Sequence, residues 1–342
     1  MLSNSQAQYV QYVEDAIIND VFYKHNKTRL EKIAQEYGIL DQNHVKELTE
    51  LAIVLRARFL AHEPNKTVKQ KFEKIVSLYN KQVNLSHRTS QSMLLQQYST
   101  PAPIAYLMGV FCGIDKPGNY FEPSAGNGLL SIAGSTGNFI VNEIEDFRNE
   151  NLKSQGYKQV TQIDGSEPLP YSKQFDAILT NPPFGRLNKK LSIKSTNGTF
   201  DITDLDHAMA IHALNAMKDN GKAAIIIGGH TTWDDKGRIQ AGKNRTFFSY
   251  LYSHYNVVDV ILIDGHKLYS RQGTAFNVRL ILIDGRKYMP GGFAPLKTKH
   301  SSTVIGDFNW LYEIITSYQT SGTSILELEA EALELELELM TF

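Results

Sequence analysis

The sequence predicts an α/β protein in which a small helical N-terminal domain precedes a doubly wound, mostly parallel sheet of seven strands with an antiparallel last strand. Residues 1–96 place apolar residues three or four apart and lack strand-like alternation. From about Gly118, short apolar runs alternate with amphipathic stretches, as in a parallel sheet covered by helices. The last two runs are joined by only residues 264–277, which favours an antiparallel pair.

Each element follows from its local pattern. Helical periodicity predicts N-terminal helices over 5–21, 28–36, 43–61 and 67–79 and a later helix over 102–110. Apolar runs predict strands at 119–121, 138–142, 159–163, 176–180, 223–227, 257–263 and 278–283. We therefore expect domains at 1–96 and 97–300, followed by a C-terminal helix and Leu/Glu-rich tail over 301–342.

Composition limits the class of protein. The lone Cys112 cannot form an internal disulfide, and acidic residues interrupt the N-terminal region where a signal peptide needs an apolar run. No apolar run approaches the roughly 18 residues of a membrane-spanning helix. We expect a cytoplasmic protein with no membrane partner and, with one cysteine and scattered histidines, no metal site.

Charge is balanced overall but unevenly distributed. Lys and Arg number 35 against 36 Asp and Glu, and six of the glutamates lie in residues 325–342. Residues 56–90 hold eight basic and two acidic residues. This stretch has two interpretations, a phosphate-binding surface or a solvated helix face.

The most informative motif is Asn181-Pro182-Pro183-Phe184, which directly follows the strand expected at 176–180. Its two prolines hold the neighbouring carbonyl groups rigidly. The Asn181 amide oxygen and a carbonyl can accept both hydrogens of a planar exocyclic amine, and Phe184 offers a face for stacking. A proline-rich turn is the alternative interpretation.

A second candidate site is the turn 122–128, Glu-Pro-Ser-Ala-Gly-Asn-Gly, which we expect to open a helix whose N-terminus favours a negative group. Glu143 ends the next strand and suits the two hydroxyls of a ribose. Asp164 ends the third strand, where it suits an adenine amino group. Because all three follow consecutive parallel strands, we expect them at one edge of the sheet.

A third motif, Gln97-Tyr98-Ser99-Thr100-Pro101, precedes the helix expected at 102–110. Thr100 or Ser99 can cap that helix, with Pro101 in its first turn. The same geometry places a hydroxyl and N–H groups beside a carboxylate.

Together these motifs resemble those of the S-adenosylmethionine-dependent DNA amino-methyltransferases, specifically the N6-adenine group with γ-like motif order, over roughly residues 97–285. Residues 97–101 resemble motif X, 122–128 motif I, Glu143 motif II, Asp164 motif III and 181–184 motif IV. The resemblance implies a seven-stranded methyltransferase sheet, a catalytic domain over 97–300, DNA as partner and S-adenosylmethionine as cofactor.

The resemblance also implies residue roles. The residues that would bind the cofactor are Tyr98, Thr100, Glu122, Ser124, Ala125, Gly126, Gly128, Glu143, Ile144, Asp164 and Asn181. Asn181, Pro182, Pro183 and Phe184 would hold a flipped adenine whose N6 attacks the sulfonium methyl group directly. Methylation of a pyrimidine at carbon 5 needs a Cys nucleophile, conventionally after Pro, and is excluded, because Cys112 follows Phe111 in an apparently buried helix and is next to none of these motifs.

Other residues could contact the nucleic acid. In the expected loop 185–203 the basic residues Arg186, Lys189, Lys190 and Lys194 suit phosphates, and the loop could close over the base; Lys243 and Arg245 form a second group. Only about sixty residues follow Ile283, fewer than a target-recognition domain of this family needs. Specificity would then come from the N-terminal helices, a separate specificity subunit or further domains of a larger protein.

Several alternatives stay open. An RNA base, N4 of cytosine and a protein glutamine also present planar amines to such a motif. The fold could also serve an inactive nucleic-acid-binding module of a larger assembly. The biological role of a methylated product, whether restriction-modification, regulation or protection of a mobile element, is likewise open.

Overall fold

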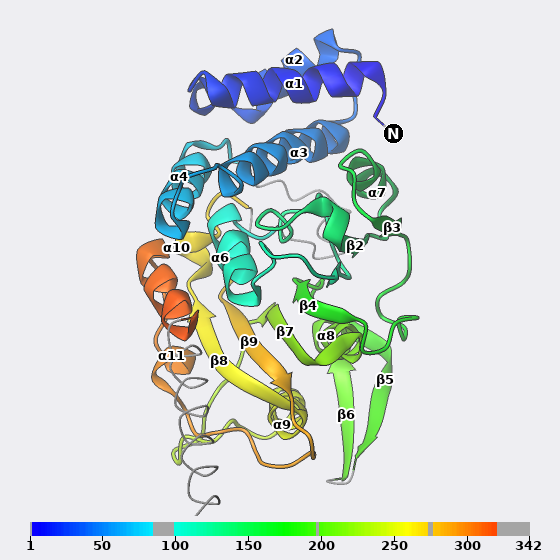
Figure 1. The fold of residues 1–342 in the computed structure, drawn as a ribbon, viewed down its shortest axis with the longest axis vertical. Coiled ribbons are helices and arrows are strands. Elements are labelled where there is room, and N and C mark those ends of the chain that lie inside the picture. The colour runs from blue at the N-terminus through cyan, green and yellow to red at the C-terminus, as the bar shows by residue number, and fades with distance from the viewer. Residues whose placement is uncertain (1, 85–98, 196–197, 273–275, 320–342) are drawn as a thin grey trace, which may run out of the picture.

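A computed structural model describes residues 2–84, 99–195, 198–272 and 276–319. The Leu/Glu-rich tail, Gln97 and Tyr98 lie outside the described residues. A layer of helices covers one end of an α/β sheet (Figure 1). No helix in the described ranges is long and apolar enough to cross a membrane.

The four expected N-terminal helices are confirmed. They are α1 (Asn4–Ile18), α2 (Lys27–Glu36), α3 (Gln42–Ala61) and α4 (Val68–Lys81), with one 3-10 turn, η1 (Phe22–Lys24), after the first. Side-chain caps fix their starts: Ser3 and Thr67 form capping boxes, and Asn26 and Asp41 accept bonds from first-turn N–H groups. Helix α3 lies between α1 and the sheet (Figure 1).

The helix expected at 102–110 is α6 (Ala102–Cys112), and the buried Cys112 is its last residue. The expected cap is wrong, because the residue before the helix is Pro101 and no side chain caps it. The Thr100 hydroxyl instead accepts a hydrogen bond from Asn181.

All seven expected strands belong to one sheet. In chain order they are β1 (Tyr120–Glu122), β2 (Phe139–Asn142), β3 (Gln159–Thr161), β4 (Phe175–Thr180), β7 (Met217–Gly228), β8 (Tyr255–Ile263) and β9 (Val278–Arg286). The strand order is β3-β2-β1-β4-β7-β9-β8. The first four strands and β7 pair in parallel, whereas β9 runs antiparallel to both β7 and β8, which confirms the expected antiparallel last strand.

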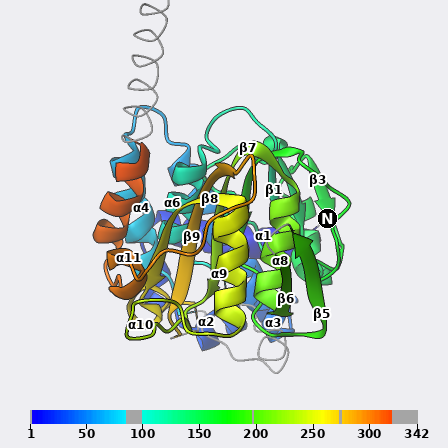
Figure 2. The ribbon, with the colours of Figure 1, turned by 90° about the horizontal axis from the view of Figure 1, so that it is seen from below.

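Alternate strand residues face opposite sides of the sheet, so each face has its own apolar core. Helices α8 (Leu205–Asn215) and α9 (Lys243–His254) cover one face (Figure 2). Helix α6, the N-terminal helices and the helical residues 308–319 cover the other. Shorter elements complete the fold: η2 (Thr136–Asn138), α7 (Asp146–Lys153), α10 (Gly265–Leu268) and α11 (Lys299–Ser302).

Two expectations about connections are wrong. Residues 185–203 are not an open loop: they form an antiparallel ribbon of β5 (Arg186–Ser195) and β6 (Gly198–Asp204). Its apolar side chains, among them Phe200 and Ile202, pack into the core under α8 and α9. The turn 122–128 opens no helix, because the buried residues 129–134 continue as turns after Gly128, whose φ is +91°.

Candidate active site

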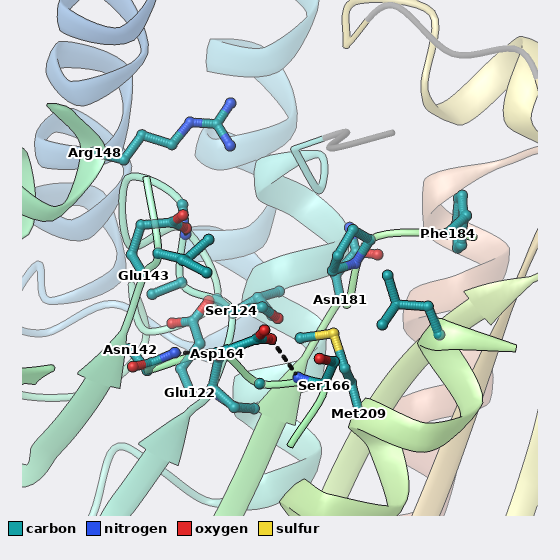
Figure 3. Close-up of a pocket in the computed structure, with 18 of the residues that line it drawn as sticks. Glu122, Ser124, Asn142, Glu143, Arg148, Asp164, Ser166, Asn181, Phe184 and Met209 are labelled. Atoms are coloured by element: carbon teal, nitrogen blue, oxygen red, sulfur yellow. Dashed lines mark hydrogen bonds between the residues drawn. The ribbon is translucent and has the colours of Figure 1, made fainter. Parts of the chain in front are cut away.

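A cavity of about 470 Å³ lies at the carboxyl edge of the parallel strands (Figure 3). Loops after β1, β2, β3 and β4 line it. The structure brings most of the expected site residues to this cavity: Thr100, Glu122, Ser124, Ala125, Gly126, Glu143, Ile144, Asp164, Asn181, Pro183, Phe184 and Arg186. Gly128 and Pro182 are outside its lining.

The turn after β1 is held open toward the cavity. Gly126 has a φ of +55°, and a Cβ there would meet no atom within 4 Å, so the backbone is accessible from the cavity. The Ala125 N–H donates to the Asn142 carbonyl at 2.8 Å, and the Gly126 N–H donates to Glu143 Oε2 at 2.7 Å. A ligand can therefore approach the turn closely.

Glu143 is buried beside this turn. Its second oxygen accepts the Glu145 N–H at 2.9 Å, so two backbone groups orient the carboxylate. Burial raises the pKa of Glu143 above its ordinary value, although the charge of Arg148 opposes the change. In Figure 3 the side chain faces the cavity, as binding of a ribose diol requires.

Glu122 is the most deeply buried carboxyl group of the cavity, with 1% of its surface exposed. Among the described residues, nothing hydrogen-bonds its Oε2. Burial holds the pKa of Glu122 well above the ordinary value. An unsatisfied buried acceptor in a cavity wall fits a ligand that brings a cationic donor, such as an ammonium group.

The loops after β2 and β3 place Ile144 and Asp164 in the cavity wall. Asp164 Oδ1 accepts the Ser166 N–H at 2.9 Å, which fixes the loop after β3. Ile144 is half exposed although it is apolar, and it lines the cavity. A carboxylate beside an apolar surface fits a base that has an amino group and a flat ring.

Sequence reasoning missed Asn142, which joins two of these loops. Its amide nitrogen donates to the carbonyls of Pro123 and Ile163 at 3.1 and 2.9 Å, and its oxygen accepts the Ile163 N–H at 2.7 Å. The signal available in the sequence was a polar residue ending an apolar strand next to Glu143.

The motif 181–184 lies at the other side of the cavity (Figure 3). Asn181 Nδ2 donates to Thr100 Oγ1 at 3.0 Å. This hydrogen bond orients the amide group and so determines where Asn181 Oδ1 lies. Ser124 Oγ lies 3.0 Å from Thr180 Oγ1, so the turn after β1 is also tied to the strand before the motif. The amide and the Phe184 ring thus stand next to the cavity.

Helix α3 supplies polar contacts that sequence reasoning also missed. Arg148 pairs with Glu47, with Nε and Oε2 2.8 Å apart, and both side chains are buried. The Asn127 amide in the turn donates to Glu47 and Glu50 at 2.7 and 2.8 Å. Arg58 donates to Tyr157 OH at 2.7 Å. Residues this far apart in sequence give no local signal of their pairing.

The expected nucleic-acid contacts are spread along the ribbon. Arg186 lies at its base beside the cavity, whereas Lys189, Lys190 and Lys194 follow along β5, which extends away from the N-terminal helices (Figure 1). Lys190 pairs with Asp201 at 2.6 Å.

The second basic group, Lys243 and Arg245, begins helix α9. Lys243 pairs with Asp204 at 2.5 Å. Asp204, Asp206 and His207 are buried together, and the atoms with which they could bind a metal ion lie within 4.8 Å of one another. The ammonium of Lys243 already supplies a positive charge to this group.

The sheet has the strand order and the antiparallel β9 of a methyltransferase. Its cavity offers groups for a ribose, an amine and a base. Together these features define a methyltransferase of the S-adenosylmethionine-dependent class. The model of the family described as N-6 DNA Methylase matches residues 118–283. This match covers 166 of the 342 residues of the chain, and the cofactor is S-adenosylmethionine.

Solved structures with a similar fold are distant. A Listeria monocytogenes protein described as a class I S-adenosylmethionine-dependent methyltransferase is 10% identical, with coverage of 90% of this chain and 94% of that one and a TM-score of 0.43. A Pyrococcus horikoshii protein described as an RNA methyltransferase is 17% identical, with coverage of 63% and 98% and a TM-score of 0.40. The type IIG restriction endonuclease BpuSI is 13% identical, with coverage of 84% and 37% and a TM-score of 0.44. Comparison with curated proteins finds no match.

Proposed function

We propose that this chain transfers the methyl group of S-adenosylmethionine to the exocyclic N6 amine of adenine in DNA. The observation that carries the proposal is the Asn181 amide, oriented by Thr100 at the end of β4 beside the cofactor cavity. The match to the N-6 DNA Methylase family model supports DNA as the substrate. The whole DNA-modifying unit would draw its specificity from the N-terminal helices, a specificity subunit or further domains.

In this mechanism the protein binds and orients the amine. The bound cofactor would supply an electrophilic methyl group on a sulfonium. Asn181 Oδ1 and the Pro182 carbonyl accept the two N–H hydrogens, so the nitrogen lone pair faces the methyl group. The S–C bond of bound S-adenosylmethionine would break as the N–C bond forms, and the extra proton of the product would pass to water. Phe184 stacks on the flipped base, which is out of the duplex.

Binding of the polyanion is proposed for Arg186, Lys189, Lys190, Lys194, Lys243 and Arg245. All six are in or next to the ribbon and the start of α9. Because phosphate contacts release counterions, affinity for DNA should fall steeply with salt if these residues bind it.

The test is transfer of labelled methyl to unmethylated genomic DNA, followed by digestion to nucleosides, with RNA in parallel. We expect N6-methyladenine from DNA and a loss of roughly 100-fold or more in Asn181→Ala with cofactor binding retained, since this amide would act on charge that develops during transfer. Asn215→Ala, at the exposed end of α8, is the control.

Labelled methyl in RNA, in N4-methylcytosine or in a protein would show that the substrate is another amine and not N6 of adenine in DNA. Wild-type transfer by Asn181→Ala would refute the role of the motif. A protein that binds the cofactor yet modifies none of these substrates would be an inactive module of an assembly.

A further inference from the structure

Glu50, on helix α3 of the N-terminal region, is a carboxylate in the wall of the cofactor cavity. Only 3% of its surface is exposed, yet it is one of the lining residues. Its Oε2 accepts the Asn127 amide at 2.8 Å. No described residue hydrogen-bonds the other oxygen, Oε1, so a bound molecule can satisfy it.

The position of Glu50 assigns it to one end of the cavity. Its partner Asn127 follows Gly126, whose N–H donates to Glu143. Arg148 interacts electrostatically with both Glu143 and Glu50. In Figure 3, Arg148 and Glu143 lie on the side of the cavity opposite Asn181 and Phe184. Glu50 therefore belongs to the ribose side and not to the side that holds the amine.

The cavity contains groups that fit S-adenosylmethionine at each of its parts. The buried Oε2 of Glu122 suits the ammonium, the open backbone at Gly126 allows close approach, and Glu143 is oriented toward a diol. Each oxygen of Glu143 already accepts one backbone N–H, whereas a ribose brings two further hydroxyl donors.

We propose that helix α3 forms one wall of the cofactor site and that the Glu50 carboxylate accepts a hydrogen bond from a ribose hydroxyl of bound S-adenosylmethionine. Glu143 accepts a hydrogen bond from the ribose on the other side of the sugar. The N-terminal helices and the sheet region thus contribute one carboxylate each. The N-terminal helices are then part of cofactor binding and not a separate module. This inference rests on the cofactor and is independent of the nature of the amine that is methylated.

The test measures binding of two ligands to the full chain by calorimetry without nucleic acid. S-Adenosylhomocysteine contains the amino-acid end, and 5′-methylthioadenosine contains only the nucleoside end. We compare wild type with Glu50→Gln, which keeps an acceptor for Asn127 but removes the charge, and with Glu36→Gln, an exposed control at the end of α2. Glu50→Asp, which withdraws the carboxylate from the cavity, is the second variant if Glu50→Gln does not fold.

We expect Glu50→Gln to raise Kd by about tenfold or more, and by the same factor for both ligands, because a hydrogen bond to a charged group is lost. Glu36→Gln should change neither value. Removal of a ribose hydroxyl from the ligand should weaken binding to wild type more than to Glu50→Gln. Unchanged affinity for both ligands would overturn the proposal, as would weaker binding of S-adenosylhomocysteine alone, which would place Glu50 at the amino-acid end.

Discussion

The buried pair of Glu47 and Arg148 should hold the N-terminal helices on the catalytic region, and Arg148→Met tests this. The pair has two close contacts, Nε to Oε2 at 2.8 Å and Nη2 to Oε1 at 3.1 Å. Arg148→Met leaves the Glu47 carboxylate buried next to Glu50 without its main cation. Loss of one partner of a buried ion pair costs about 3–5 kcal/mol, so we expect the free energy of unfolding to fall by that amount at pH 7.

The assay is urea denaturation followed by circular dichroism. Lys153→Met is the matched control, since it removes a lysine of the same helix, α7, whose pair with Glu150 is about half exposed; it should change stability by less than about 1 kcal/mol. The double variant Glu47→Leu with Arg148→Met should be more stable than Arg148→Met alone, because the Glu47 carboxylate is then no longer buried without its cation.

Acidification should narrow the difference between wild type and Arg148→Met. Burial alone would raise the pKa of Glu47, but the charges of Arg148 and Lys46 outweigh it and hold this pKa below the ordinary value of 4.5. A depressed pKa contributes stability above pH 4.5 that is lost as the pH falls further. A stability difference below 1 kcal/mol at pH 7, or one that grows on acidification, would refute the reasoning.

Three further predictions concern the cofactor and the ribbon. The raised pKa of Glu143 means that its carboxylate is protonated at a higher pH than usual, so cofactor affinity should fall as the pH is lowered from 7.5 to 5. Glu143→Gln should remove that dependence. The same slope of affinity against pH in wild type and Glu143→Gln would contradict this prediction. Gly126→Ala should weaken S-adenosylhomocysteine binding at least about tenfold in calorimetry, because the new Cβ sits at a φ of +55° and enters the cavity; wild-type affinity would argue against close approach of the ligand. Lys189→Gln with Lys194→Gln should reduce the slope of log affinity for DNA against log salt by about 1 to 2, with no change in Lys173→Gln beside Asp219; equal slopes in all three proteins would exclude the ribbon as a phosphate contact.

Local patterns were sufficient to predict the sheet. The run at 223–227 is wholly apolar and the run at 176–180 has an apolar centre, because these strands are buried on both faces. The short link 264–277 predicted the antiparallel β9. The candidate cavity also followed from sequence, since the carboxyl ends of parallel strands meet at one edge and Glu143 and Asp164 come at the end of strands.

Long-range pairing and competing local signals account for the rest. Glu47 and Arg148 are 101 residues apart, and nothing near either residue indicates its partner. The ribbon was mistaken for a loop because its basic residues dominated the pattern, although Leu191 and Ile193 alternate with polar residues. Thr100 was assigned to a helix cap because Thr before Pro is typical of one, whereas tertiary contact with Asn181 determines where its hydroxyl points.

The position of β9 has a consequence for synthesis of the chain. Strand β9 is the last of the sheet to be made, yet it lies between β7 and β8, which do not pair with each other. Until residue 286 leaves the ribosome, β7 presents an open edge and β8 has no neighbour in the sheet. A ribosome paused shortly before that point would therefore carry a five-stranded sheet with β7 as an exposed apolar edge and β8 unpaired, and this is the stage of biogenesis at which a chaperone would be needed most.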